Sequence, residues 1–134
     1  MWLKMWFLVH NGYASVEELQ KIDDRGFIGV EAMPNGWFNY ANSDALYPVK
    51  QGQTNTIPIQ YSGYYKMDFG DASLAALGQK STPKGYVWHH LDDYDPLTNT
   101  GTMQLVKQQA HNGISHVGGC SQYKAPNLYT FKTW

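Results

Sequence analysis

The stretch from residue 85 to residue 119 constrains the fold more than any other part of this sequence. Tyr86 to His90 has the composition of a short strand and ends on two adjacent histidines. A polar loop over Asp92 to Gly101 leads to a second strand, Thr102 to Val106, and a helix is predicted from Lys107 to Val117, stopped by a pair of glycines. The predicted local order is therefore strand, loop, strand, helix.

The rest of the chain is predicted to supply short elements of both kinds. The predicted segments are a strand at Met1 to Val9, a helix after Ser15 that ends near Arg25, a strand at Phe27 to Ala32, a strand around Ile57 to Ile59 and a helix at Asp71 to Leu77 stopped by Gly78. Pro58 favours an edge position for its strand, because proline donates no hydrogen bond to a ladder. We expect one α+β domain over residues 1–134, in which residues 1–55 form an N-terminal α+β portion.

Four of the five histidines fall in or just after the two-strand unit, at His89, His90, His111 and His116. Imidazole is a common ligand of transition metals and the side chain best suited to proton transfer near neutral pH. Adjacent strand residues point to opposite faces, so one of the tandem histidines can bind a metal while its neighbour addresses a substrate. Such a site can neutralise a scissile phosphate with one divalent ion while a free histidine deprotonates water.

These residues carry a resemblance to a known family. Gly85 to His90, Met103 to Val106, His111, His116 and the glycine pair at 118–119 resemble the WHH group of the HNH/endonuclease VII nuclease superfamily. Domains of that group are toxin domains at the C-termini of bacterial polymorphic toxins. The resemblance covers roughly residues 57–122 and implies a ββα-metal (His-Me finger) nuclease core, with its ββα unit at about 85–119. Asp68-Phe69 and the helix after them also look like the family.

The resemblance also implies a role for each site residue. His89 matches a metal ligand and His90 matches the general base, while Gln104 stands where a residue would brace the loop that carries the base. His111 and His116 match the helix ligands, although their spacing places them about 140° apart on a regular helix. If only one binds, the resemblance favours His111, whose separation from the base better suits the superfamily pattern. Two lysines, Lys107 and Lys124, are weaker candidates for contacts with phosphate.

The implied activity is that of a metal-dependent endonuclease that hydrolyses phosphodiester bonds. As an antibacterial toxin it would be delivered to the cytoplasm of a target cell and be held in check by a cognate immunity protein. Three imidazoles suit Zn²⁺ or Ni²⁺, whereas phosphoryl transfer often recruits Mg²⁺ or Mn²⁺. DNA and RNA both stay open as substrates. The formal net charge of −1 is unusual for a nucleic-acid binder, so a local patch or a metal must attract the phosphates.

Two other functions compete with the nuclease. In the first, histidines hold a structural zinc in a non-catalytic binding module, but such sites favour cysteine and this chain has only Cys120. In the second, Cys120 and a histidine form a hydrolase, for which the sequence has no elbow motif. The single cysteine leaves no internal disulfide. The apolar run Met1 to Val9 is too short to span a bilayer and has no cleavage site of a signal peptide.

Overall fold

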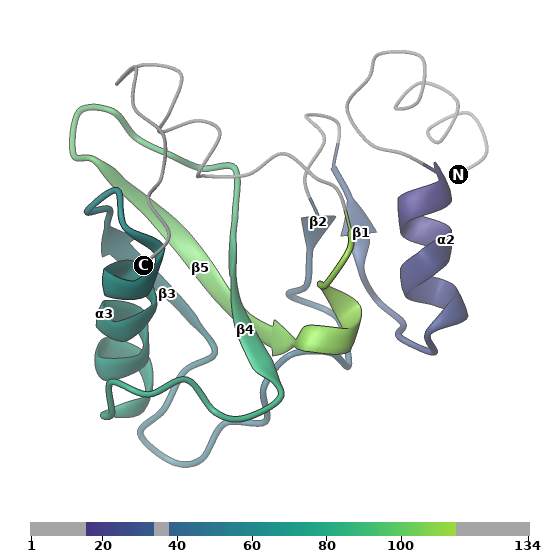
Figure 1. The fold of residues 1–134 in the computed structure, drawn as a ribbon, viewed down its shortest axis with the longest axis horizontal. Helices are drawn as coiled ribbons and strands as arrows, with labels where there is room; N and C mark the ends of the chain where they lie inside the picture. The colour runs from purple at the N-terminus through teal and green to yellow at the C-terminus, as the bar shows by residue number, and fades with distance from the viewer. Residues whose placement is uncertain (1–15, 34–37, 115–134) are drawn as a thin grey trace.

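The computed structural model describes residues 16–33 and 38–114, and the structural statements below concern those residues (Figure 1). The fold is α+β, as predicted. Its elements, in chain order, are α2 (Val16–Asp24), β1 (Glu31–Ala32), β2 (Phe38–Asn39), β3 (Thr56–Gln60), α3 (Tyr65–Leu77), β4 (Tyr86–His90), β5 (Thr100–Lys107) and the short 3-10 helix η1 (Gln108–Ala110). None of the helices in this part of the chain is long and apolar enough to cross a bilayer.

Strand β5 is the centre of a three-stranded antiparallel sheet with the order β3-β5-β4. Pro58 pairs with Thr102 in β3, which is an edge strand, so the position predicted from the proline is confirmed. On the other side of β5, His89 pairs with Gln104 in β4. Because side chains alternate along a strand, the two tandem histidines project from opposite faces of this sheet.

Each face of the sheet is covered by its own hydrophobic core. Figure 1 shows α3 on one side and the β1-β2 pair with α2 on the other. The core beneath α3 buries Ile59, Tyr61, Ala72, Ala76, Trp88, Met103 and Leu105. The opposite core buries Ile22, Phe27, Ala32, Phe38, Tyr40, Ala45, Val106, Ala110 and Ile114. Burial of each larger apolar side chain contributes about 1.5–3 kcal/mol, so both layers hold the sheet in place.

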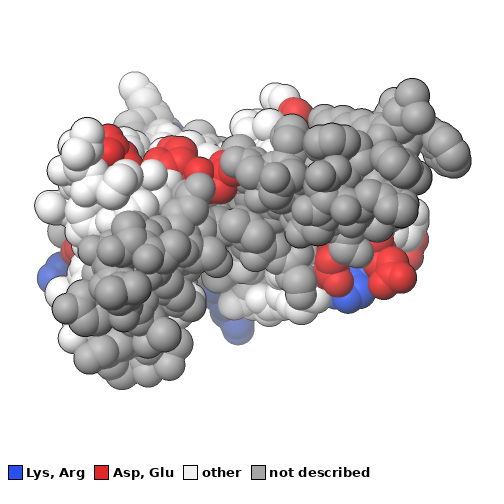
Figure 2. Space-filling view, turned by 90° about the horizontal axis from the view of Figure 1, so that it is seen from above, with Lys and Arg blue, Asp and Glu red and all other residues white. Residues whose placement is uncertain are grey.

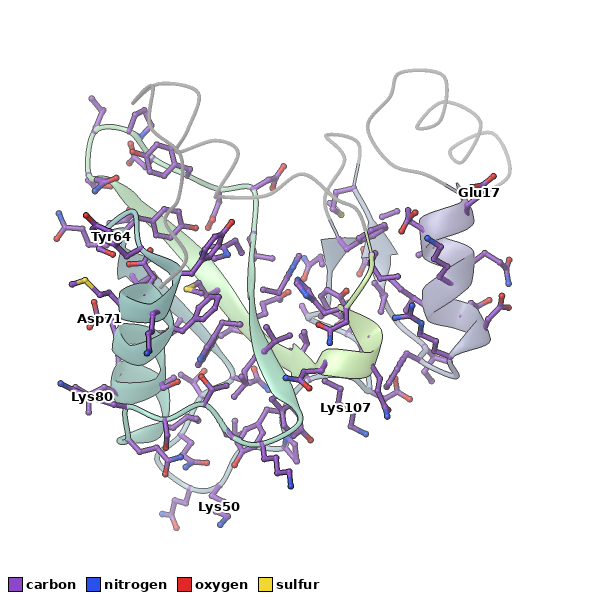
Figure 3. All side chains as sticks on the ribbon, viewed as in Figure 1. Glu17, Lys50, Tyr64, Asp71, Lys80 and Lys107 are labelled. Carbon is purple, nitrogen blue, oxygen red and sulfur yellow. The ribbon has the colours of Figure 1, made fainter. Side chains whose placement is uncertain are left out.

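Glycines end both helices where the sequence predicted. Gly26 follows α2 with φ +89°, and Gly78 ends α3 with φ +81°, its N–H donating to the carbonyl oxygen of Leu74 at 3.0 Å. The predicted start of the second helix at Asp71 is wrong, because α3 already begins at Tyr65 without a side-chain cap. Asp71 was predicted to begin the helix because aspartate is a common N-cap residue. In the structure it lies within α3, on the outer side of the helix (Figure 3).

The helix predicted from Lys107 to Val117 is also wrong at its start. Strand β5 continues to Lys107, which pairs with Tyr86 and donates its N–H to the carbonyl oxygen of Ala45 at 2.9 Å. Partners on both sides therefore keep the backbone extended, and only η1 follows before residue 114. The predicted strand at Met1 to Val9 and the end of this predicted helix lie outside the described residues.

Candidate functional site

Two of the four clustered histidines meet on one face of the sheet. The imidazole rings of His89 and His111 lie edge to face, with their centroids 5.2 Å apart and their planes at 69°. His89 comes from β4 and is fully buried, whereas His111 follows η1 and is partly exposed. The end of one strand and the turn after the next thus bring together two of the three imidazoles predicted to bind metal.

The ring of His89 has a defined orientation. Its Nε2 atom lies 2.7 Å from the backbone carbonyl oxygen of Phe38. A carbonyl oxygen only accepts, so Nε2 carries the hydrogen and the lone pair of the neutral ring is on Nδ1. The ring of Tyr40 packs against His89 with centroids 4.9 Å apart. A backbone carbonyl that accepts from the second ring nitrogen is the usual support of a metal-binding histidine.

Gln104 lies directly opposite His89 in β5 and is 1% exposed. Its Oε1 accepts from the backbone N–H of Tyr40 at 2.9 Å, and its Nε2 donates to Oδ1 of Asn39 at 3.0 Å. The sequence predicted that Gln104 braces the loop carrying the base. These hydrogen bonds of its amide run instead to residues 39–40, beside the carbonyl that holds His89.

His90 projects from the other face of the sheet, toward α3, and is 7% exposed. Three aromatic rings surround its imidazole, with centroid distances of 5.3 Å to Tyr61, 5.9 Å to Tyr65 and 6.0 Å to Phe69. The structure therefore separates the predicted base from the predicted ligands by the thickness of the sheet. His89 and His90 nevertheless share one strand end, because β4 stops at His90.

Asp68 is a buried carboxyl that the sequence marked only as similar to the family. Its Oδ1 accepts from the N–H and the hydroxyl of Ser62 at 2.8 and 2.7 Å, while its Oδ2 has no hydrogen-bond partner among the described residues. Burial raises the pKa of Asp68, and the nearby charge of Asp71 raises it further against the two hydrogen bonds from Ser62. On α3, Asp68 lies between Tyr65 and Phe69, the two helix residues that contact His90.

Arg25, the only arginine of the chain, was not singled out from the sequence. Its Nη1 donates to the backbone carbonyl oxygens of Gln109 and Asn112, both at 2.8 Å, on either side of His111. The guanidinium also lines a hollow with Gln108, Gln109 and Asn112. Only the fold brings the end of α2 to this turn, so no local pattern in the sequence could have revealed the contact.

Lys107, one of the two lysines expected to contact phosphate, lies over an aromatic ring. The Nζ atom of Lys107 lies 5.9 Å from the ring centroid of Phe27, and Figure 3 shows this side chain at the end of β5. Lys124 lies outside the described residues. In Figure 2 the described part of the upper face shows Lys and Arg only at separate points along its edges. The described part of this face therefore shows no cluster of lysines as the expected local source of positive charge.

The histidine pair was tested for its fit to a divalent ion. Two imidazoles on one tetrahedral ion have ring centroids roughly 5 Å apart, which agrees with the separation of His89 and His111. Within residues 16–33 and 38–114, no group of three or more His, Cys, Asp or Glu could hold a metal. The described pair therefore fits half of a metal site, and the further predicted ligand, His116, lies outside the described residues.

A two-strand unit with tandem histidines, enclosed in an α+β fold, is compatible with a ββα-metal nuclease core. Residues 78–126 match the family described as "a nuclease of the HNH/ENDO VII superfamily with conserved WHH", and Trp88-His89-His90 lies within the match. Residues 78–126 thus resemble a WHH nuclease region, and the match supports a nuclease function with nucleic acid as the implied substrate. No curated protein and no solved structure matches the chain.

Proposed function

We propose that this nuclease is a metal-dependent endonuclease in which His89 and His111 bind one divalent ion and His90 is the general base. The observation that carries the proposal is the 5.2 Å contact between the rings of His89 and His111 inside the matched region. Two imidazoles at this separation suit a shared ion. The hydrogen bond from His89 to the carbonyl of Phe38 fixes the ring in the tautomer that a metal ligand needs.

The two faces of β4 divide the chemistry between them. On one face, the N–H that His89 donates to Phe38 directs its Nδ1 lone pair to the ion. When bound, the ion supplies positive charge at the scissile phosphate and at the leaving oxygen. On the other face, His90 takes the proton of the attacking water, and the rings of Tyr61, Tyr65 and Phe69 hold its imidazole in place. This division of roles requires the scissile phosphate to lie at the end of β4, where the strand carrying both histidines stops.

The ion is Zn²⁺ or Ni²⁺ if the ligands are all imidazoles, because these ions favour nitrogen ligands. Mg²⁺ and Mn²⁺ are the alternatives, since their oxygen preference leaves room for water and phosphate around two histidines. Either pair supplies the local positive charge that a chain of net charge −1 needs near its substrate.

The cleavage experiment uses the purified chain with supercoiled plasmid DNA and, separately, with total RNA. Each reaction contains chelator alone or an excess of Zn²⁺, Ni²⁺, Mg²⁺ or Mn²⁺. We expect nicked and then linear plasmid, or internally cut RNA, only when an ion is present, and much slower cleavage by His90→Ala. Cleavage that persists in chelator would contradict metal dependence, and shortening only from the ends would contradict an endonuclease.

Circular dichroism in chelator separates the enzyme from a zinc-stabilised binding module. The described core buries apolar side chains on both faces of the sheet without any metal, so we expect the chain to stay folded when the ion is removed. A structural zinc would instead be coupled to folding, and its removal would unfold the protein. Loss of cleavage with retained ellipticity therefore supports the endonuclease, and loss of ellipticity supports the binding module.

We further propose that the nuclease acts as an antibacterial toxin in the cytoplasm of a target cell, with a cognate immunity protein as its inhibitor. The support is the resemblance of residues 57–122 to toxin domains. Induced synthesis in a bacterial cytoplasm should lower viable counts and degrade nucleic acid, whereas His90→Ala should do neither. Unchanged viability with an active enzyme would contradict the toxin role.

A further inference from the structure

Three consecutive residues outside the matched region contact the histidine site from β2 and the residue after it. The carbonyl oxygen of Phe38 accepts from His89 at 2.7 Å, and Oδ1 of Asn39 accepts from Gln104 at 3.0 Å. Tyr40 contacts the site at three points. A short segment far from the tandem histidines in sequence therefore supports the strand that carries them.

Tyr40 connects the two halves of the histidine pair. Its ring packs edge-on against His89 with centroids 4.9 Å apart. Its hydroxyl donates to the carbonyl oxygen of Ala110 at 2.8 Å, one residue before His111, and its backbone N–H donates to Gln104 at 2.9 Å. Tyr40 is fully buried, so these contacts are fixed by packing on every side.

We propose that Tyr40 is a positioning residue for the His89–His111 pair. The ring restrains the imidazole of His89, and the hydroxyl restrains the turn from which His111 projects. Metal sites demand that ligands lie within a few tenths of an ångström of the ideal distance, so a link of this kind sets the affinity for the ion. The inference rests on the proposed function, because the separation of two imidazoles matters only if they share an ion.

The turn before His111 has a second support on the solvent side. Arg25 donates to the carbonyl oxygens of Gln109 and Asn112, while Tyr40 donates to that of Ala110 between them. Removal of one donor therefore leaves the turn attached by the other. The two donors can be removed separately without loss of the whole segment.

The test measures binding of Zn²⁺ and of Ni²⁺ by isothermal titration calorimetry. Tyr40→Phe removes the hydroxyl and keeps the ring, and we expect an affinity about 10- to 100-fold weaker than that of the wild type, the usual effect of losing a group that orients a ligand. Cleavage by this variant should return at saturating metal, because His90 is on the other face. Arg25→Gln loosens the same turn from outside and should also weaken metal binding.

Ser73→Ala is the matched control. It removes another buried hydrogen bond, the 2.9 Å contact from Nε1 of Trp88 to the hydroxyl of Ser73, on the face of α3. The control should lower the unfolding temperature like Tyr40→Phe and leave metal affinity unchanged. Equal loss of affinity in the control would overturn the inference, because the effect would then follow stability alone.

The remaining outcomes separate this inference from the proposed function. Wild-type affinity in both Tyr40→Phe and Arg25→Gln, with normal binding by the unaltered chain, would overturn the positioning role and leave the endonuclease intact. A wild-type chain that binds neither ion and cleaves nothing under any of the four metals would overturn both.

Discussion

His89 and Phe38 are 51 residues apart in sequence, yet Nε2 of the histidine lies 2.7 Å from the carbonyl oxygen of the phenylalanine. This contact predicts that the neutral ring of His89 carries its hydrogen on Nε2. Long-range ¹H–¹⁵N correlation spectra distinguish the two tautomers by the nitrogen shifts. We expect Nε2 to resonate as a protonated nitrogen and Nδ1 as one with a lone pair. The reverse pattern would mean that Nδ1 cannot be the atom that binds the ion.

Replacement of each tandem histidine should impair a different property, metal binding for His89 and cleavage rate for His90. His89→Ala should weaken metal binding, and excess metal should partly restore cleavage. His90→Ala should bind metal nearly normally but lose roughly two to four orders of magnitude in rate, which is the usual contribution of a general base. Calorimetry and single-turnover cleavage on both variants check these outcomes. Rescue of His90→Ala by added metal would show that the roles are assigned the wrong way round.

Gly101 and Gly70 should respond to alanine in opposite directions. A Cβ on Gly101 in β5 would overlap the hydroxyl and ring of Tyr61, which packs against His90 at 5.3 Å. Gly101→Ala should therefore cost about 1–3 kcal/mol of unfolding free energy and slow cleavage. In α3, the nearest atom to a Cβ on Gly70 is the carbonyl oxygen of Lys80 at 3.9 Å. Gly70→Ala should add about 0.5–1 kcal/mol and leave cleavage unchanged.

Urea unfolding and cleavage rates measured on both glycine variants check this pair. A stable, fully active Gly101→Ala protein would show that Tyr61 moves aside without affecting His90. Destabilisation by Gly70→Ala would contradict the open space found beside that helix position.

Asp68 should make stability depend on pH. Burial raises its pKa above the ordinary value of 3.8, so the folded chain binds this proton more tightly than the unfolded chain. Stability therefore falls as pH rises above 3.8, and the loss is complete above the folded pKa. Asp68→Asn keeps an oxygen for Ser62 and should be more stable than wild type at neutral pH. The stability difference between Asp68→Asn and wild type should become smaller as the pH is lowered toward 3.8.

Thermal unfolding of wild type and Asp68→Asn across acidic and neutral pH checks this trend. Asp23→Asn, at an exposed position on α2, serves as the control for the loss of one carboxyl group from the chain. A constant gap between Asp68→Asn and wild type at all pH values would mean that the carboxyl does not titrate as its burial requires.

Residue pattern, proline and glycine correctly predicted the elements whose limits depend on residues close together in the sequence. The strand at Tyr86–His90 has the predicted bounds, Pro58 lies on an edge strand, and Gly78 ends its helix. Two boundaries failed because tertiary contacts set them. Helix α3 begins without a capping side chain, so no sequence signal marks Tyr65. The backbone of Lys107 is held extended by Tyr86 and Ala45, which are distant in sequence.

The site was also predictable only in part: the histidines were found from the sequence, and the residues that hold them in place were not. Spacing and resemblance brought His89 and His111 together, and the structure places their rings in contact. The groups that hold these rings escaped notice because their contacts join residues far apart in sequence. Tyr40 and Ala110 are 70 residues apart, and Arg25 and Gln109 are 84 residues apart. Neither periodicity nor motif spacing reports such pairs. The roles of His116 and Lys124 stay predictions.

The position of residues 38–40 has a consequence for any transfer of the matched region between proteins. A graft of residues 78–126 would carry the tandem histidines but leave β5 without its neighbour β3, and would leave His89 without the carbonyl of Phe38. Recombination that joins a foreign leading segment at residue 78 should therefore yield inactive chimeras. A transferable unit in this chain has to start no later than α2, where Arg25 reaches the turn before His111.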